Sequence, residues 1–219
     1  MKRLHVKAYS VLMTLVALVW TQKLAAQTFE YPIYEDDDVR IEVKSKGARP
    51  TISDFATAIF DYSKEMEFFD KVYEDWKRYQ QKKPLRHHGN FIVDIKNGFM
   101  SYETPGAEGN GTIYLEMCFW NCADAKHKLV ACNVRWKMGE DYGWSEYVGC
   151  RFYLYDNEKK TMRVILPEDI GTLYDGNCLS AFFLPRKGKN IRVTVSSEGE
   201  RWDEVLEWDG YKFSTKEAP

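Results

Sequence analysis

The spacing of the apolar residues changes near residue 90, from a helical period to a strand-like alternation. Before this point, apolar side chains recur every three or four positions, which places them in one stripe along a helix. The stripe consists of Phe55, Ile59, Tyr62, Met66, Phe69, Tyr73 and Trp76. Thr51 and Asp54 form a capping-box pattern at its start, and Pro84 cannot continue a helix at its end. The pattern therefore predicts one long amphipathic helix over about residues 52–82.

After Asn90, apolar and polar residues alternate, which is typical of strands with one buried face. Strands are expected at 90–95, 98–104, 111–120, 127–136, 147–155, 160–166, 179–184, 189–195, 203–208 and 211–213. Asn97-Gly98 and Asp209-Gly210 are hairpin signals, and such short connections require antiparallel neighbours. The predicted fold class is α+β, with the long helix packed on a curved, mainly antiparallel meander sheet of about eight to ten strands. The alternative is a β-sandwich with an N-terminal helical extension.

The first residues have the three parts of an export signal. Lys2, Arg3 and Lys7 precede an apolar run over 9–20, and small residues follow at Ala25-Ala26. The run is shorter than the ~20 residues that a membrane-spanning helix needs, and no cysteine follows it to accept a lipid. We therefore expect a cleaved signal peptide over 1–26, a single α+β domain over 27–219 with no transmembrane segment, and a periplasmic or secreted location.

The charge and composition exclude two classes of protein. The chain has 31 basic and 33 acidic side chains, and four of the basic ones lie within residues 1–26. The remaining chain is therefore acidic, which excludes a polybasic nucleic-acid-binding protein. The sequence is 44% hydrophobic and 15% aromatic, which excludes a disordered chain. We expect one sizeable hydrophobic core.

Three internal segments and the end of the export signal carry a resemblance. These are the segments Glu116–Asp124, Phe152–Asn157 and Leu184–Gly188, and the signal ending Ala25-Ala26-Gln27. Together they resemble uncharacterised exported proteins of gut-dwelling Gram-negative bacteria. The resemblance implies a bacterial protein in the periplasm or at the cell surface, and it brings no activity and no site residues with it.

Four residues have the chemistry of zinc ligands. Cys118, Cys122, His127 and Cys132 are separated by three, four and four residues. This spacing fits a zinc knuckle poorly, because Cys118 and Cys132 fall in neighbouring strands. They remain weak metal candidates, and we expect no metal and no cofactor. An odd cysteine count leaves at least one free thiol, and Cys122 with Cys178 is the first pair to test for a disulfide.

No sequence motif selects catalytic residues. The motifs of serine hydrolases, zinc proteases, P-loop proteins and dinucleotide-binding folds are absent from the sequence. A secreted hydrolase remains an alternative, through Cys118 or Cys122 with His127, or through paired carboxylates. The available acids are Glu116, Asp124, Glu140 and Asp141. The sequence favours a protein that is not an enzyme.

Aromatic and charged side chains gather on one side of the predicted sheet and in one loop. The strand residues are Tyr114, Glu116, Trp120, Arg135, Arg151 and Tyr153, and the loop residues are Tyr142 and Trp144. Such a face can bind a ligand, for example a carbohydrate or a peptide, or it can be a solvated face with cross-strand ion pairs. The first interpretation predicts an exported non-catalytic binding or accessory protein of unknown ligand. An assembly protein that dimerises through helix 52–82 is a further alternative, so monomer and dimer both remain open.

Overall fold

The protein is described by a computed structural model over residues 39–106, 111–137, 149–171, 179–197 and 200–217. The chain divides into a unit at 1–30 and a unit at 31–219, and every described residue belongs to the second unit. The predicted signal peptide, Tyr142, Trp144 and Cys178 lie outside the described residues. In the described part of the chain, no helix combines the length and the apolar character that a membrane span requires.

Two helices replace the single long helix that the apolar stripe predicted. They are α2 (Ile52–Ser63) and α3 (Glu67–Gln80), and the chain between them becomes extended at Met66. The expected cap at the start is confirmed, because the Thr51 backbone N–H donates to the Asp54 carboxylate at 2.8 Å. The prediction of one helix was wrong. No Gly or Pro marks the break in the sequence, and the break follows from packing instead.

The break allows α3 to fold back against α2. The ring of Phe60 on α2 lies 5.9 Å from that of Trp76 and 6.3 Å from that of Phe69, both on α3. Tyr62 and Met66, which belong to the predicted stripe, are exposed beside the break. A straight helix of about 30 residues would extend roughly 45 Å, whereas two shorter helices place both apolar faces on the same sheet.

The strands form two antiparallel sheets. The first contains β1 (Ile41–Glu42), β2 (Asn90–Asp94), β3 (Phe99–Pro105), β4 (Thr112–Asn121), β5 (His127–Lys137), β6 (Cys150–Asp156) and β7 (Thr161–Ile165). Its strand order is β1-β7-β6-β5-β4-β3-β2. A short 3-10 helix, η2 (Pro167–Ile170), leads towards the second sheet. That sheet contains β8 (Leu179–Phe183), β9 (Ile191–Ser197), β10 (Glu200–Trp208) and β11 (Phe213–Glu217), in the order β11-β10-β9-β8.

The α+β class and the antiparallel pairing are therefore confirmed, whereas the single meander of eight to ten strands is not. The structure has eleven strands in its described residues, divided into sheets of seven and four. Both expected hairpins are present, joining β2 to β3 and β10 to β11. Gly98 and Gly210 have positive φ angles of 64° and 109°, which explains the glycine in each turn.

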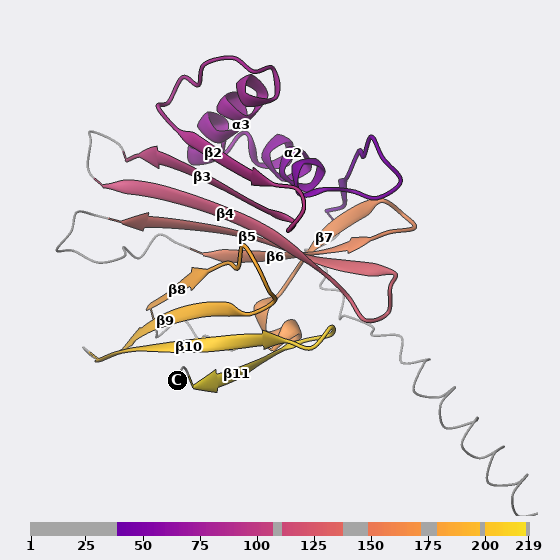
Figure 1. Cartoon of the computed structure of the whole chain (residues 1–219), viewed down its shortest axis with the longest axis vertical. Helices are drawn as coiled ribbons and strands as arrows, with labels where there is room; N and C mark the ends of the chain where they lie inside the picture. The colour runs from indigo at the N-terminus through magenta and orange to yellow at the C-terminus, as the bar shows by residue number, and fades with distance from the viewer. Residues whose placement is uncertain (1–38, 107–110, 138–148, 172–178, 198–199, 218–219) are drawn as a thin grey trace, which may run out of the picture. The chain divides into compact units, whose positions relative to one another are not determined.

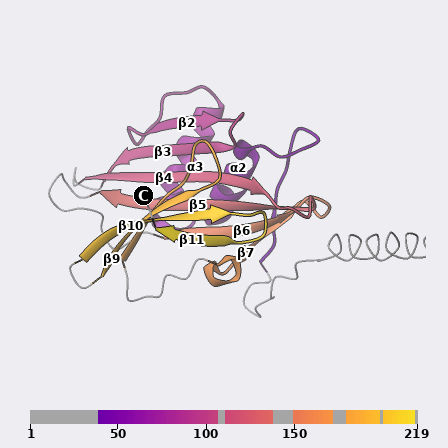
Figure 2. The same ribbon diagram turned by 60° about the horizontal axis from the view of Figure 1, so that its bottom comes forward.

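The helices cover one face of the seven-stranded sheet, and the four-stranded sheet covers the other face (Figures 1 and 2). Alternation along β4 supplies both interfaces. Leu115 and Met117 belong to the core beneath the helices, whereas Cys118 and Trp120 belong to the core between the sheets. Since the sheet is covered on both sides, its central strands contain continuous buried runs, such as 128–133 on β5.

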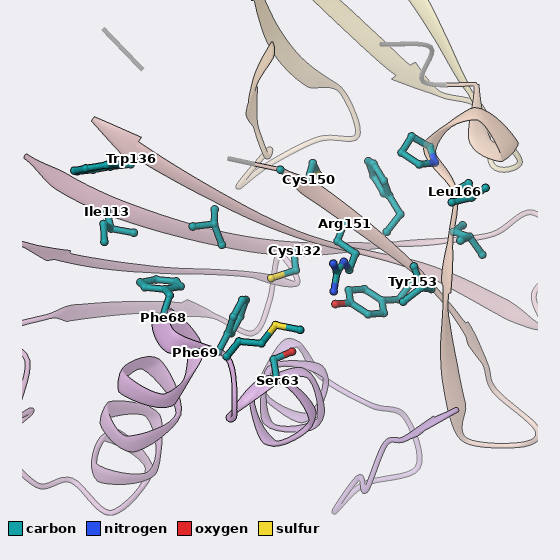
Figure 3. A pocket seen from close by; sticks show the side chains of 17 residues that line it. Ser63, Phe68, Phe69, Ile113, Cys132, Trp136, Cys150, Arg151, Tyr153 and Leu166 are labelled. Carbon is teal, nitrogen blue, oxygen red and sulfur yellow. The ribbon is translucent and has the colours of Figure 1, made fainter. Parts of the chain in front are cut away.

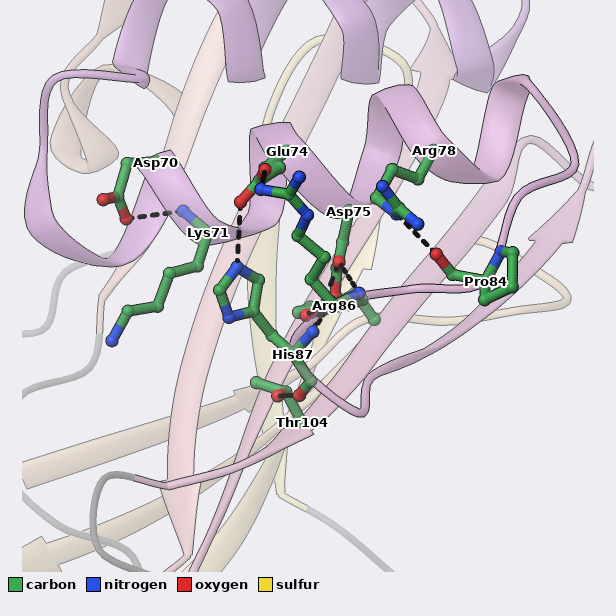
Figure 4. Close-up of polar contacts among 10 residues, drawn as sticks. Asp70, Lys71, Glu74, Asp75, Arg78, Pro84, Arg86, His87 and Thr104 are labelled. Carbon is green, nitrogen blue, oxygen red and sulfur yellow. Dashed lines mark hydrogen bonds and ion pairs between the residues drawn. The ribbon is translucent and has the colours of Figure 1, made fainter.

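A buried carboxylate fixes the connection from α3 to β2 (Figure 4). Asp75 has no exposed surface, and one of its oxygens accepts a hydrogen bond from the Arg86 backbone N–H at 2.7 Å. The other accepts from the Tyr102 hydroxyl at 2.8 Å and lies 3.3 Å from the His87 backbone nitrogen. At the surface, Glu74 pairs with the side chains of Arg86 and His87. One side chain on α3 therefore orders a segment that has no regular structure of its own.

Candidate functional site

A cavity of about 850 Å³ lies between the corner of the two helices and the first sheet (Figure 3). Its volume is within the range of about 300–1,000 Å³ that small-molecule sites occupy. The helix corner contributes Ser63, Met66, Phe68 and Phe69, and the helix-facing side of the sheet contributes Ile113, Cys132, Val134, Trp136, Arg151, Tyr153 and Val164. The other described residues of the lining are Gly149, Cys150, Phe152, Ile165, Leu166 and Pro167. Most of these side chains are apolar.

The break between α2 and α3 creates the helical wall of this cavity. Figure 3 shows Phe68 and Phe69 projecting from the start of α3 towards the strands, with Ser63 at the end of α2 beside them. Across the cavity, Val134 and Trp136 lie on the same side of β5 as the buried Cys132, yet both are only partly buried. The helices therefore leave this part of the sheet uncovered, and apolar side chains remain accessible within it.

The cavity contains one charged group among its described lining residues, the guanidinium of Arg151. Figure 3 shows this group pointing into the cavity near the hydroxyl of Tyr153. Burial raises the pKa of Tyr153, and the nearby Arg151 acts in the opposite direction. The phenol therefore stays protonated near neutral pH and is available as a hydrogen-bond donor.

The thiols in the cavity wall are poor nucleophiles. Burial raises the pKa of Cys132 to about 12, and it raises the pKa of Cys150 well above its usual range. A thiol attacks as the thiolate, so both groups are essentially unreactive at neutral pH. The chemistry of this lining favours binding of a ligand over covalent catalysis.

Three of the predicted binding residues lie together on the side of the first sheet that faces the second sheet. Arg135 pairs with Glu116 at 2.5 Å, and its guanidinium lies over the Tyr114 ring at 5.5 Å. The other Glu116 oxygen accepts from the Leu184 backbone N–H at 3.1 Å, and Arg135 also lies over Phe183 at 4.2 Å. Phe183 is the last residue of β8 and Leu184 follows it, so this cluster joins the two sheets.

Trp120 lies on the same side of the sheet and is also buried. It is 4% exposed, and its Nε1 donates to the Lys189 backbone carbonyl at 3.0 Å. Its ring packs edge-to-face against Phe213 on β11 at 5.5 Å. The packing of the second sheet therefore occupies the face of β4 and β5 on which a ligand surface was predicted.

Arg151 and Tyr153 lie on the opposite, helix-facing side of the sheet, at the cavity. The strand register explains why the six residues do not share one face. Arg135 is paired with Tyr114, whereas Arg151 is paired with Cys132, which faces the helices. Alternation sorts the residues within a strand, but it does not say which faces of two strands coincide.

The four weak zinc candidates do not converge. Cys118 belongs to the core between the sheets and Cys132 to the core beneath the helices, so the two thiols point to opposite sides. His127 interacts through Nδ1 with the Asp124 carboxylate at 2.6 Å. Burial also raises the pKa of Cys122 to about 12, which makes it a poor nucleophile for a hydrolase. In the segments that the structure describes, no group of three His, Cys, Asp or Glu residues could hold a metal ion.

We expect four unoxidised thiols that react slowly in the folded protein. Cys118, Cys122, Cys132 and Cys150 are free, and burial raises the pKa of each. In a Cys178→Ser variant without added reductant, dithionitrobenzoate should modify four thiols after unfolding and none rapidly before it. Fewer than four reactive thiols in the unfolded variant would show a disulfide among these residues and contradict the structure.

No protein-family model, curated protein or solved structure matches this chain. The candidate site therefore depends on its own geometry. Three residues singled out from the sequence line the cavity, namely the predicted binding residues Arg151 and Tyr153 and the weak metal candidate Cys132, whereas the aromatic corner was not predicted. A signal was present, since adjacent Phe68 and Phe69 cannot both point along the stripe of one straight helix.

Proposed function

We propose that this protein is an exported, non-catalytic binding protein whose ligand is a small apolar molecule held in the cavity between the helix corner and the first sheet. The observation that carries the proposal is the cavity of about 850 Å³ with a largely apolar and aromatic lining. Burial of apolar ligand surface contributes about 25 cal/mol per Å², so such a lining can bind without many polar contacts.

The surroundings support binding to a preformed site. The wall formed by α3 is held by the buried Trp76, whose ring lies 5.3 Å from Phe91 on β2 and whose Nε1 donates to Thr57 on α2 at 2.9 Å. A site whose walls are already ordered loses less conformational entropy when its ligand binds.

The signal-like segment at 1–26 and the resemblance to exported bacterial proteins support an extracytoplasmic setting, in the periplasm or outside the cell. An apolar molecule has low solubility in water, so a protein that sequesters it is a useful carrier in an aqueous compartment.

The alternatives have weaker support. Dimerisation through the helices would need an exposed apolar stripe, but Phe55, Ile59 and Trp76 are buried in the core of the chain itself. A thiol hydrolase would need a thiolate, and burial disfavours one at Cys118, Cys122 and Cys132. Glu140 and Asp141, two of the acids that a carboxylate mechanism could use, lie outside the described residues.

Filling the cavity should weaken the binding of an uncharged apolar probe. N-phenylnaphthylamine fluoresces strongly only in apolar surroundings, so its titration with the folded protein reports the site directly. Val134→Phe places a larger side chain in the cavity wall and should weaken binding about tenfold or more, which is roughly 1.4 kcal/mol or more.

Val205→Phe is the matched control. Val205 is a partly buried valine on β10, away from the cavity, so this variant should bind the probe within about twofold of the original protein. A thermal melt of each variant separates loss of the site from loss of the fold, and Val164→Phe is the second cavity variant if Val134→Phe does not fold. Absence of binding to the original folded protein, or equal binding by both variants, would refute the proposed function.

A further inference from the structure

We propose that the ligand of this cavity is a long-chain carboxylate of the fatty-acid type, whose head group pairs with Arg151 while its chain lies among the aromatic side chains. This inference rests on the proposed function, since it names the ligand class of the same cavity. The geometry that supports it is one guanidinium in a lining whose other described residues carry no charge.

The charge of Arg151 is not balanced within the described residues. It forms no ion pair with any of them, and the described lining of the cavity contains no carboxylate. Other arginines of the chain do have acidic partners, as in the pairs Arg135–Glu116 and Arg186–Asp94. A ligand with one negative charge would supply the missing partner, whereas a cation would be repelled.

The groups around the guanidinium favour a carboxylate. The planar donor edge of Arg151 matches the two oxygens of a carboxylate, and such pairs are often bidentate. The hydroxyl of Tyr153 lies beside the guanidinium and supplies a neutral donor to the same head group. Together these two side chains can satisfy one carboxylate without burying a second charge.

The position of Arg151 also fits an amphipathic ligand. Arg151 is exposed although it lines the cavity, so its guanidinium remains in contact with water. An ionised carboxylate is costly to bury, and pairing it at an exposed guanidinium avoids that cost. The apolar chain can then extend between Phe69 on α3 and Trp136 on β5, which both line the cavity.

Displacement of N-phenylnaphthylamine by two ligands of equal chain length tests this inference. Dodecanoate carries the negative charge and dodecanol does not, so their difference isolates the head group. Arg151→Gln should weaken dodecanoate binding about tenfold at low salt and leave dodecanol binding within about twofold. Added salt should weaken dodecanoate binding to the original protein, because part of the attraction is screened.

Arg201→Gln is the matched control, since it removes the same charge from an exposed arginine on β10 outside the cavity. It should leave the binding of both ligands unchanged. Equal weakening of dodecanoate and dodecanol by Arg151→Gln would overturn the inference, because Arg151 would then act only through the shape of the cavity. The inference also fails if the probe binds but dodecanoate does not displace it, and this result leaves the proposed function intact. If the probe itself does not bind, the proposed function is refuted, and this inference fails with it.

Discussion

Trp76→Ala is expected to destabilise the fold by about 3–5 kcal/mol, which is a large fraction of the stability of a domain of this size. Trp76 is 1% exposed and lies where α2, α3 and β2 meet. Its ring stacks on Tyr79 at 5.5 Å and meets Phe60 edge-to-face at 5.9 Å. Truncation would leave a cavity among these rings. It would also remove the hydrogen bond that the indole N–H donates to the Thr57 hydroxyl.

Urea unfolding, monitored by circular dichroism, measures this loss of stability. The slope of the unfolding free energy against urea concentration is compared between the variants. Trp202→Ala is the matched control, because Trp202 is 40% exposed at the surface of β10. We expect this control to cost less than about 1 kcal/mol. A loss below about 1 kcal/mol for Trp76→Ala would contradict the placement of Trp76 in the helix-covered core.

Asp75→Ala should cost about as much, roughly 3–5 kcal/mol, although it removes a polar side chain. Removal of the carboxylate leaves the Arg86 backbone N–H and the Tyr102 hydroxyl without their acceptor in the interior. Burial raises the pKa of Tyr102, and the adjacent Asp75 raises it further, so the phenol remains a donor at neutral pH. The connection from α3 to β2 would therefore lose its main attachment.

Two further variants separate the contributions to this effect. Asp70→Ala removes an exposed carboxylate from the same helix and should cost less than about 1 kcal/mol. Tyr102→Phe removes only the hydroxyl donor and should cost about 1–2 kcal/mol. If unfolding measurements gave Asp75→Ala and Asp70→Ala the same small effect, Asp75 would not be the buried acceptor that the structure describes.

Local patterns in the sequence predicted much of the secondary structure. The alternation on β4 and β5 gave these strands nearly their observed bounds, and Asn97-Gly98 and Asp209-Gly210 marked real hairpins. These features depend on neighbouring residues, so a single sequence contains the information. The capping box at Thr51 is of the same kind.

Features that depend on distant contacts were not predicted. The break at Met66 has no local cause, and it follows from the packing of Phe60 against Phe69 and Trp76. The separation into two sheets depends on which face each strand buries, and alternation shows two faces without showing what covers them. Arg151 and Tyr153 were therefore grouped with Glu116 and its neighbours, although they lie on the opposite face at the cavity.

A crystal structure of the protein grown with saturating dodecanoate would test directly whether this cavity binds a long-chain carboxylate. We expect electron density for the chain of the ligand between Phe69 and Trp136, with its carboxylate within hydrogen-bonding distance of Arg151. An empty cavity at saturation, or dodecanoate bound only elsewhere on the protein, would contradict the assignment of this cavity as the binding site.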